Sequence, residues 1–285
     1  AAQVPAMTSE VVVIDPGAEP RRELRYDWTV DQPERLETTV TVDMSASENG
    51  QPVMDMELPV SMVVDAVVTK TNPNGTAWVA MTFEDMAFGP LIASGGGLPD
   101  GDLAGAAFDE AMAQVEPLLS EVRVWQLIGD RGLVVDTNVQ FPGGFPAEAE
   151  QQILQTSGSV ALLPAEPVGI GARWESTGAT VNQGISLAVT TTMELVEMDG
   201  DDLTLAMSVR LAEGSDTVLP TTNPFGDVTV EGEGAYRLDL GSVFPRQASM
   251  TMAMDMAGDI PDGSGATNTV EMQMDIGMTM ESELD

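Results

Sequence analysis

The sequence contains neither cysteine nor histidine in its 285 residues. Without cysteine the chain cannot form a disulfide bond, a thiolate metal site or a thiol nucleophile. Without histidine it cannot form a Ser-His-Asp triad, an imidazole metal site or an imidazole acid–base pair. These two absences remove the commonest catalytic groups. We therefore expect a protein that is not an enzyme and that uses no metal or cofactor.

Basic residues are also scarce. Eleven Lys and Arg residues face 46 Asp and Glu residues, which gives a formal net charge of −35, and Lys70 is the single lysine. Such a surface repels phosphate groups, so we expect no nucleic acid and no anionic membrane surface among the partners. Acidic side chains can serve solubility alone. They also suit a salty habitat, where screening weakens their mutual repulsion. The sequence leaves both explanations open.

Long apolar runs and aromatic residues are missing as well. No run approaches the roughly 20 apolar residues of a membrane-spanning helix, and aromatic residues make up 5% of the chain. Hydrophobic residues nevertheless reach 43%, enough for a packed core. The start, Ala1-Ala2-Gln3, is typical of a mature end left after a leader is cleaved. We therefore expect an extracytoplasmic location: secreted, periplasmic or at the cell surface.

Apolar and polar residues alternate along most of the chain, the pattern of half-buried strands. We divide it into a tether or edge strand (1–20), an N-terminal β region (21–160) and a C-terminal methionine-rich antiparallel β region (161–285). A strand is expected to start at Arg22, with Leu24, Tyr26 and Trp28 on one face. The dipeptide Asn49-Gly50 predicts a hairpin turn.

Two segments have helical signals. Apolar residues recur at spacings of three and four between Leu103 and Leu119, and Pro146 with Glu148 is typical of a helix start. We expect a main helix near 102–119 and a short one near 146–157. The fold class predicted is α+β and β-rich: long antiparallel strands curled, as in a half-barrel, around these helices. A similar layout of residues 63–83 and 189–209 leaves open a division into two similar halves.

Methionine is unusually common near the C-terminus, where it occupies alternate positions of two predicted strands. Side chains two residues apart share a face of a strand. Two neighbouring strands would therefore place eight methionines on one face, namely Met250, Met252, Met254, Met256, Met272, Met274, Met278 and Met280.

This methionine pattern has three interpretations. The first is an ordinary core, although β-branched residues fit strands better. The second is a deformable apolar cavity for a small molecule or lipid, because the unbranched thioether side chain adapts to varied shapes. The third is a thioether copper(I) site, which the absence of histidine and cysteine disfavours. The cavity is the leading hypothesis for function.

An alternative function is a structural subunit of an extracellular or surface assembly. Val11, Val12, Val13 and Ile14 form a short apolar run between proline-containing flanks. Such a strand can add to the sheet edge of a neighbouring molecule. In this case the N-terminal segment would mediate self-assembly.

One motif resembles a known family. It opens the second β region and reads Leu163-Pro164-Ala165-Glu166-Pro167-Val168-Gly169-Ile170-Gly171-Ala172-Arg173-Trp174. The pattern is similar to one in an uncharacterised family of bacterial secreted proteins and lipoproteins. That resemblance implies location and architecture but no chemistry. The overall layout is also loosely similar to the half-barrel lipid carriers of the bacterial envelope.

Overall fold

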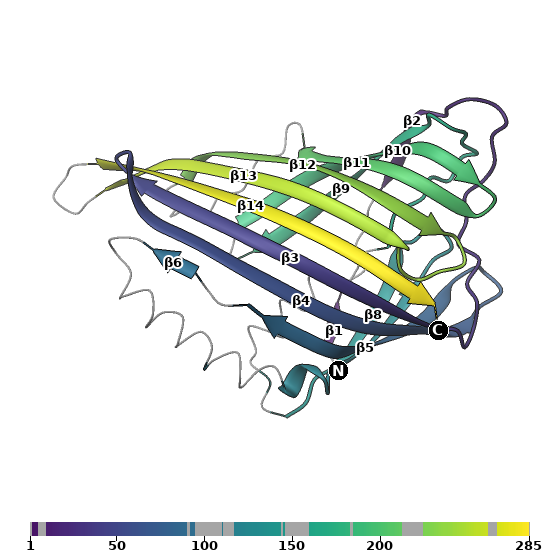
Figure 1. The fold of residues 1–285 in the computed structure, drawn as a ribbon. Coiled ribbons are helices and arrows are strands. Elements are labelled where there is room, and N and C mark those ends of the chain that lie inside the picture. The colour runs from purple at the N-terminus through teal and green to yellow at the C-terminus, as the bar shows by residue number, and fades with distance from the viewer. Residues whose placement is uncertain are drawn as a thin grey trace.

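The computed structural model of the chain consists of one large antiparallel sheet (Figure 1). The structure describes residues 2–4, 10–89, 92–94, 110, 117–143, 145, 160–182, 185–212, 225–261 and 267–284. The strands are β1 (Ala2–Val4), β2 (Val11–Asp15), β3 (Pro33–Glu48), β4 (Gln51–Thr71), β5 (Ala77–Phe88), β6 (Ile92–Ser94), β7 (Arg123–Ile128), β8 (Val134–Gln140), β9 (Arg173–Asn182), β10 (Ile185–Asp199), β11 (Asp202–Leu211), β12 (Phe225–Asp239), β13 (Gln247–Pro261) and β14 (Thr267–Leu284).

The sheet consists of two meanders joined side by side. Its order is β1-β8-β7-β5-β4-β3-β14-β13-β12-β11-β10-β9-β2, with β6 paired to β4. The first meander comes from the N-terminal β region and the second from the C-terminal one. They meet where β3 pairs with β14, from Glu34↔Leu284 to Glu48↔Val270. The two regions therefore share one continuous sheet.

Both edge strands come from the N-terminal segment. Strand β1 pairs with β8 at one edge, and β2 pairs with β9 at the other. Val4 and Val11 are seven residues apart, and an extended chain spans at most about 3.6 Å per residue, so they lie within about 25 Å of each other. The two edges must therefore approach each other, which requires the sheet to curl strongly.

The hairpin joining β3 and β4 follows from its turn residues. Asn49 and Gly50 both have positive φ, 51° and 75°. A two-residue hairpin turn with this geometry matches the twist of the flanking strands, and asparagine and glycine adopt it at the lowest cost. The prediction of a turn here is confirmed.

One end of the sheet is densely packed. We call it the packed end; it is where β3 begins and β14 ends, at the right in Figure 1. The opposite end, which holds the β3–β4 turn, is the distal end. At the packed end the inner face contributes fully buried side chains, such as Trp174 (1% exposed) and Leu205 (0% exposed).

An extended segment, residues 21–32, crosses the packed end; we call it the strap. The Asp27 N–H bonds to the Leu240 carbonyl beyond β12, and the Asp31 N–H bonds to the Val68 carbonyl at the end of β4. Strands β3, β14 and β13 lie between β4 and β12 in the sheet. The strap therefore passes over all three. Its Tyr26 and Trp28 rings stack, with centroids 4.6 Å apart, and both side chains are buried in the core.

The strap corrects one prediction. The alternation of Leu24, Tyr26 and Trp28 indicates a strand from Arg22, but Arg22 forms only an isolated bridge to Val168. The segment is extended without joining the sheet. An extended chain that crosses a sheet face also buries every second side chain, so the alternation could not separate the two cases.

The helical part of the predicted fold is not confirmed. Residues 110 and 117–119 are helical. The rest of the predicted helix at 102–119, and the predicted helix at 146–157, lie outside the described residues. The described part of the chain is β-rich, and its long strands are antiparallel as predicted.

The motif of residues 163–174, which we call the family-like motif, covers the packed end together with the strap. Val168 and Arg22 exchange backbone hydrogen bonds, and the Trp174 indole donates to the Leu162 carbonyl at 2.8 Å. Gly171 has φ of +82°, and a Cβ at Gly169 would overlap the Ala18 carbonyl oxygen. The residues of the motif therefore serve close backbone packing against the segment before the strap.

We predict that Gly169→Ala lowers the free energy of unfolding by about 1–3 kcal/mol, because the added methyl group forces two backbone segments apart. Gly178→Ala is the matched control, since a Cβ there meets nothing within 4 Å. Urea unfolding followed by tryptophan fluorescence checks this. Equal stability of the two variants would contradict the close approach of Gly169 and Ala18.

The acidic charge is concentrated in cross-strand rows on the outer face. Asp43 pairs with Asp275 on one side and with Glu57 on the other, and all three are exposed. Directly opposed like charges on a sheet destabilise it. We therefore expect the unfolding midpoint to rise between about 0.1 M and about 1 M NaCl, as the Debye length falls from ~10 Å to ~3 Å.

The variant Asp43→Asn with Asp275→Asn should depend less on salt than the wild type. The control removes the same charge from loop residues, by Glu121→Gln with Glu166→Gln. An identical salt dependence of both double variants would mean that net charge, and not the cross-strand row, sets the response.

Candidate ligand-binding face

The register confirms that the eight predicted methionines share one face of two neighbouring strands. In β13 and β14, Met250 pairs with Met278, Met254 with Met274 and Met256 with Met272. Met252 pairs with Ile276, and Met280 pairs with Ala248. No register shift interrupts this pairing or the pairing of β14 with β3. The alternation along each strand therefore becomes a continuous surface.

The structure extends this surface onto two strands from the other half of the chain. Met274 pairs with Met44 of β3, which pairs with Met56 of β4. Met272 pairs with Ala46, which pairs with Met54. We define the methionine face as the eight predicted residues together with Met44, Met54, Met56 and Met62. The sequence indicated a shared face for Met54 and Met56, because they occupy alternate positions of one predicted strand.

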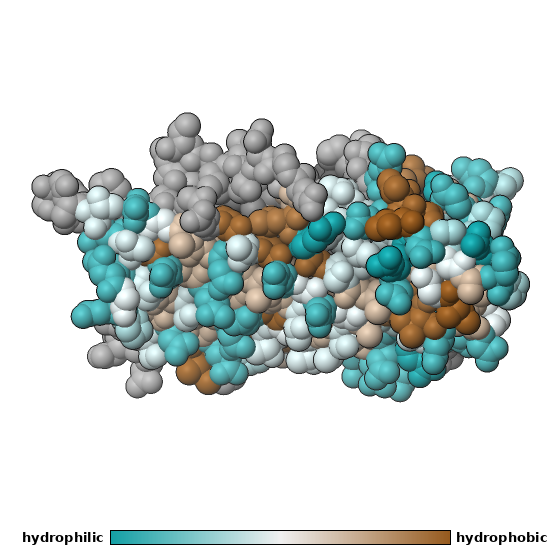
Figure 2. All heavy atoms as spheres, turned by 90° about the horizontal axis from the view of Figure 1, so that it is seen from above, coloured by the Kyte–Doolittle hydropathy of each residue, from teal (hydrophilic) through white to brown (hydrophobic). Residues whose placement is uncertain are grey.

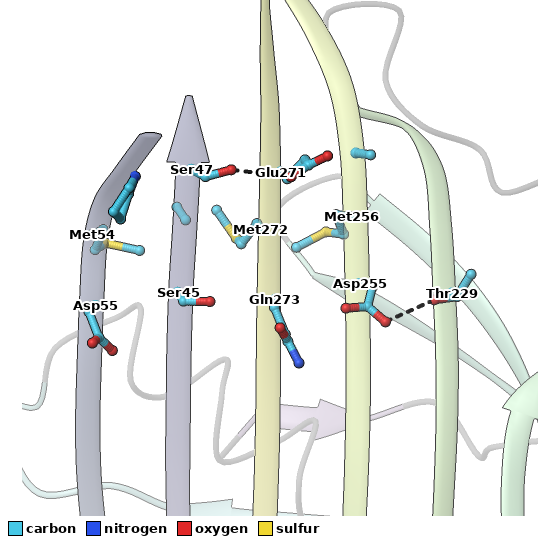
Figure 3. Close-up of a pocket in the computed structure, with 13 residues that line it drawn as sticks. Ser45, Ser47, Met54, Asp55, Thr229, Asp255, Met256, Glu271, Met272 and Gln273 are labelled. Carbon is cyan, nitrogen blue, oxygen red and sulfur yellow. Dashed lines mark hydrogen bonds between the residues drawn. The ribbon is translucent and has the colours of Figure 1, made fainter. Parts of the chain in front are cut away.

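Figure 3 shows part of this arrangement at the distal end. Met54, Met272 and Met256 lie in one row across β4, β14 and β13. A polar row lies beside it, in which Asp255 accepts a hydrogen bond from the Thr229 hydroxyl at 3.4 Å. Apolar and polar side chains thus alternate by row as well as along each strand.

The methionine face lies on the same side of the sheet as the core. Met62, Met250 and Met280 pack against the main core cluster. From there the face continues toward the distal end, and the eight predicted methionines are all half-buried. The inner face therefore changes from fully buried Leu, Val and Trp at the packed end to partly accessible methionine beyond it.

The inner face carries no charge over most of its length. In β3 the inner positions between Glu34 and Glu48 are uncharged. The described inner positions of β4, β12, β13 and β14 at the same level of the sheet are uncharged too. The basic residues of these strands lie on the outer face; Arg35, for example, pairs with Asp65 at 3.4 Å. An apolar molecule on this face would meet neither a carboxylate nor a cation from the described residues of these five strands.

Glu34 lies where the uncharged surface ends at the packed end, and it is 4% exposed. Its carboxylate accepts hydrogen bonds from the Val243 N–H at 2.8 and 2.9 Å and from the Phe244 N–H at 3.1 Å. Burial raises the pKa of this carboxyl group above its ordinary value, against the lowering effect of those N–H groups and of Arg246. Glu34 thereby fixes the loop between β12 and β13 over the core.

Several hollows lie along the opposite, mostly polar face of the sheet. One of about 600 Å³ lies over the distal parts of β3, β4, β12, β13 and β14. Its polar lining includes Ser45, Asp55, Thr229, Asp255, Glu271 and Gln273, and the methionines Met54, Met256 and Met272 lie beside them. The lining of this hollow therefore mixes thioether groups with carboxylates, unlike the uncharged inner face.

The alternative assembly residues lie in β2 at the edge of the sheet. Val11 and Val13 pack toward the core, whereas Val12 (53% exposed) and Ile14 (50% exposed) point outward. Strand β2 pairs with β9 of the same chain. The segment around it is therefore held on its own sheet, which runs against its use as a free strand donated to a neighbour.

Apolar side chains are exposed near this edge. Seen from above, most of the surface is hydrophilic, with apolar atoms in the middle and at the end that carries β2 (Figure 2). Ile170 and Val196 are exposed here, and the Gly171 N–H bonds to the Leu195 carbonyl between them. Val12 and Ile14 are exposed on β2, which pairs with β9 at this edge.

The described residues contain neither a cluster of metal-ligating side chains nor a membrane-spanning helix. In this part of the chain, no group of three or more acidic, histidine or cysteine side chains is placed to hold a metal ion. No described helix has the length and apolar character needed to cross a membrane.

Comparisons with known proteins identify no family. No family model and no curated protein matches the sequence. Among solved structures, lipovitellin, described for its lipid–protein interactions, is 12% identical with a TM-score of 0.46; the match covers 91% of this chain and 25% of lipovitellin. The chain thus spans about a quarter of that protein's length.

Two further solved structures, one of them an outer-membrane protease, give weaker matches. The protease OmpT of Escherichia coli is 9% identical with a TM-score of 0.19, covering 91% of this chain and 98% of OmpT. The Pseudomonas putida toluene transporter TodX is 8% identical with a TM-score of 0.19, covering 90% and 91%. At these scores none of the likenesses carries an argument about function.

The raised pKa of Glu34 predicts a pH dependence of stability. A carboxyl group whose pKa is higher in the folded state stabilises the fold fully below its unfolded pKa of about 4.5, and this contribution falls as the pH rises through the folded value. Glu34→Gln loses one acceptor and should cost about 1–3 kcal/mol. The stability difference between wild type and variant should shrink with increasing pH above about 4.5.

Chemical denaturation at a series of pH values checks this, with the exposed Glu37→Gln as control. A difference that grows with pH would mean that the backbone N–H groups outweigh burial and that the pKa of Glu34 is lowered.

Proposed function

We propose that this protein binds an apolar small molecule or lipid on the methionine face, without catalysing a reaction, and that it works outside the cytoplasm. The observation that carries the proposal is the inner face itself. This face is uncharged and rich in methionine. Its methionine side chains are half-buried beyond the point where the fully buried core of the packed end stops. A contiguous apolar surface of this kind is typical of a binding site.

The residue type supports a ligand more than a core. A sheet that only had to fill its own interior would be served better by valine or isoleucine, which fit strands. Met254, Met274, Met44 and Met56 form one unbroken row across four strands. Flexible thioether chains along such a row can close over ligands of different shape. This favours a chain-like or irregular apolar ligand.

The acidic composition supports the proposed location. A net charge of −35 keeps the outer face of such a protein hydrated outside the cytoplasm. An apolar ligand would be shielded on the inner face while the outer face remains hydrated. We therefore infer a carrier or a receptor of the cell envelope or secreted fraction.

Titration with the neutral fluorescent dye Nile red tests the proposal. We expect saturable binding with increased emission, and at least about a tenfold loss of affinity in Met254→Gln with Met274→Gln, equal to about 1.4 kcal/mol. These residues are cross-strand partners, and glutamine keeps the chain length while adding a polar amide.

The matched control is Thr251→Gln with Thr279→Gln, two exposed residues of the same strands on the outer face. It should bind the dye like the wild type. Binding that is weak in all proteins, or equal in both double variants, would overturn the proposed function.

A further inference from the structure

Two polar side chains are buried beside the methionine face without a hydrogen-bond partner. They are the Thr38 hydroxyl, in a residue 4% exposed, and the Trp28 indole N–H, in a residue 7% exposed. No other buried side-chain N or O atom of the described residues lacks a partner. A buried polar group without a partner costs about 1–3 kcal/mol, so their presence requires a reason.

Thr38 belongs to the inner face at the boundary between the core and the methionine face. It pairs with Met280 of β14 on one side and with Met62 of β4 on the other. Along β3, Leu36 precedes it on the same face at the packed end, and Val40, Val42 and Met44 follow toward the distal end. A molecule lying along the methionine face would end at Thr38.

Trp28 belongs to the core cluster against which Met62 and Met280, the two neighbours of Thr38, also pack. It lies in the strap, which passes over the beginning of β3 and the end of β14, because Asp27 bonds to Leu240 and Asp31 bonds to Val68. The indole N–H is a hydrogen-bond donor only, whereas the threonine hydroxyl both donates and accepts. Together they offer two donors and one acceptor at the closed end of an apolar surface.

The charges nearby define which headgroup fits. Glu34 precedes Thr38 on the same face of β3 by two inner positions, and its buried carboxylate is already occupied by two backbone N–H groups. Arg246, the cation near it, donates to Asp239 at 2.6 Å. Among the described residues, an anionic headgroup would meet a carboxylate and no unpaired cation here, whereas a hydroxyl group both donates and accepts and an ester group accepts.

We propose that the ligand of the methionine face is an uncharged amphiphile, such as an acylglycerol or a long-chain alcohol, whose polar head bonds to Thr38 and Trp28. This rests on the proposed function. The hydrocarbon chain lies along the methionine rows toward the distal end. The head reaches Thr38 when Met62 and Met280 shift, which unbranched side chains do at low cost.

The experiment compares three molecules with the same oleyl chain: 1-monooleoylglycerol, oleate and oleylamine. Each displaces Nile red from the full-length protein at a pH where the oleate is ionised and the amine is protonated. We expect the neutral glycerol ester to bind at least about tenfold more tightly than either ion. Preferential binding of oleate or oleylamine would overturn the inference.

The variant Thr38→Val tests the headgroup contact. It should weaken the binding of 1-monooleoylglycerol about tenfold and raise the urea midpoint of the ligand-free protein, because it removes an unpaired buried hydroxyl. Trp28→Phe should lower the same ester's affinity through loss of the indole donor. Thr39→Val, on the outer face of the same strand, should change none of these values.

The outcomes separate the two proposals. If the wild type does not bind Nile red, the proposal that the methionine face is a binding site is refuted. Normal dye binding, with no preference for the neutral head or no effect of Thr38→Val on it, would refute the headgroup contact alone. A lower urea midpoint for Thr38→Val would show that the hydroxyl is already satisfied, and would also refute that contact.

Discussion

The pairing of β3 with β14 is the constraint on which the rest of the structure depends. These strands belong to opposite halves of the chain and run antiparallel without a register shift. A slip by one residue would move every inner side chain of one half to the outer face. The observed register aligns Met274 with Met44, and so joins a methionine pattern from the C-terminus to one from the N-terminal region.

The two ends of this sheet differ in how far their inner faces are covered. At the packed end, the strap and the segment that carries the family-like motif cover the inner face, and their backbone groups bond to each other and to the ends of the strands. Toward the distal end the strands continue with a surface that is apolar but only half-buried. A rigid closed end attached to an adaptable, half-buried surface suits the binding of a long apolar molecule.

Several features could be predicted from the sequence because they depend on local chemistry. The Asn49-Gly50 turn follows from positive φ at both residues, and the shared face of Met254 and Met274 follows from the two-residue period of strands. The strap could not be distinguished from a strand, since both bury alternate residues. The pairing of Met44 with Met274 depends on long-range strand order, which the sequence does not encode locally. The unpaired Thr38 hydroxyl becomes visible only when its surroundings are known.

The central claim is that the methionine face holds an apolar molecule, and native mass spectrometry of gently purified protein tests it most directly. We expect a mass above that of the chain by a few hundred daltons, lost on denaturation and recovered by organic extraction as an uncharged lipid. A wild-type protein that remains at the mass of the bare chain, even after incubation with neutral lipids, would contradict the account and make the methionine face an ordinary part of the core.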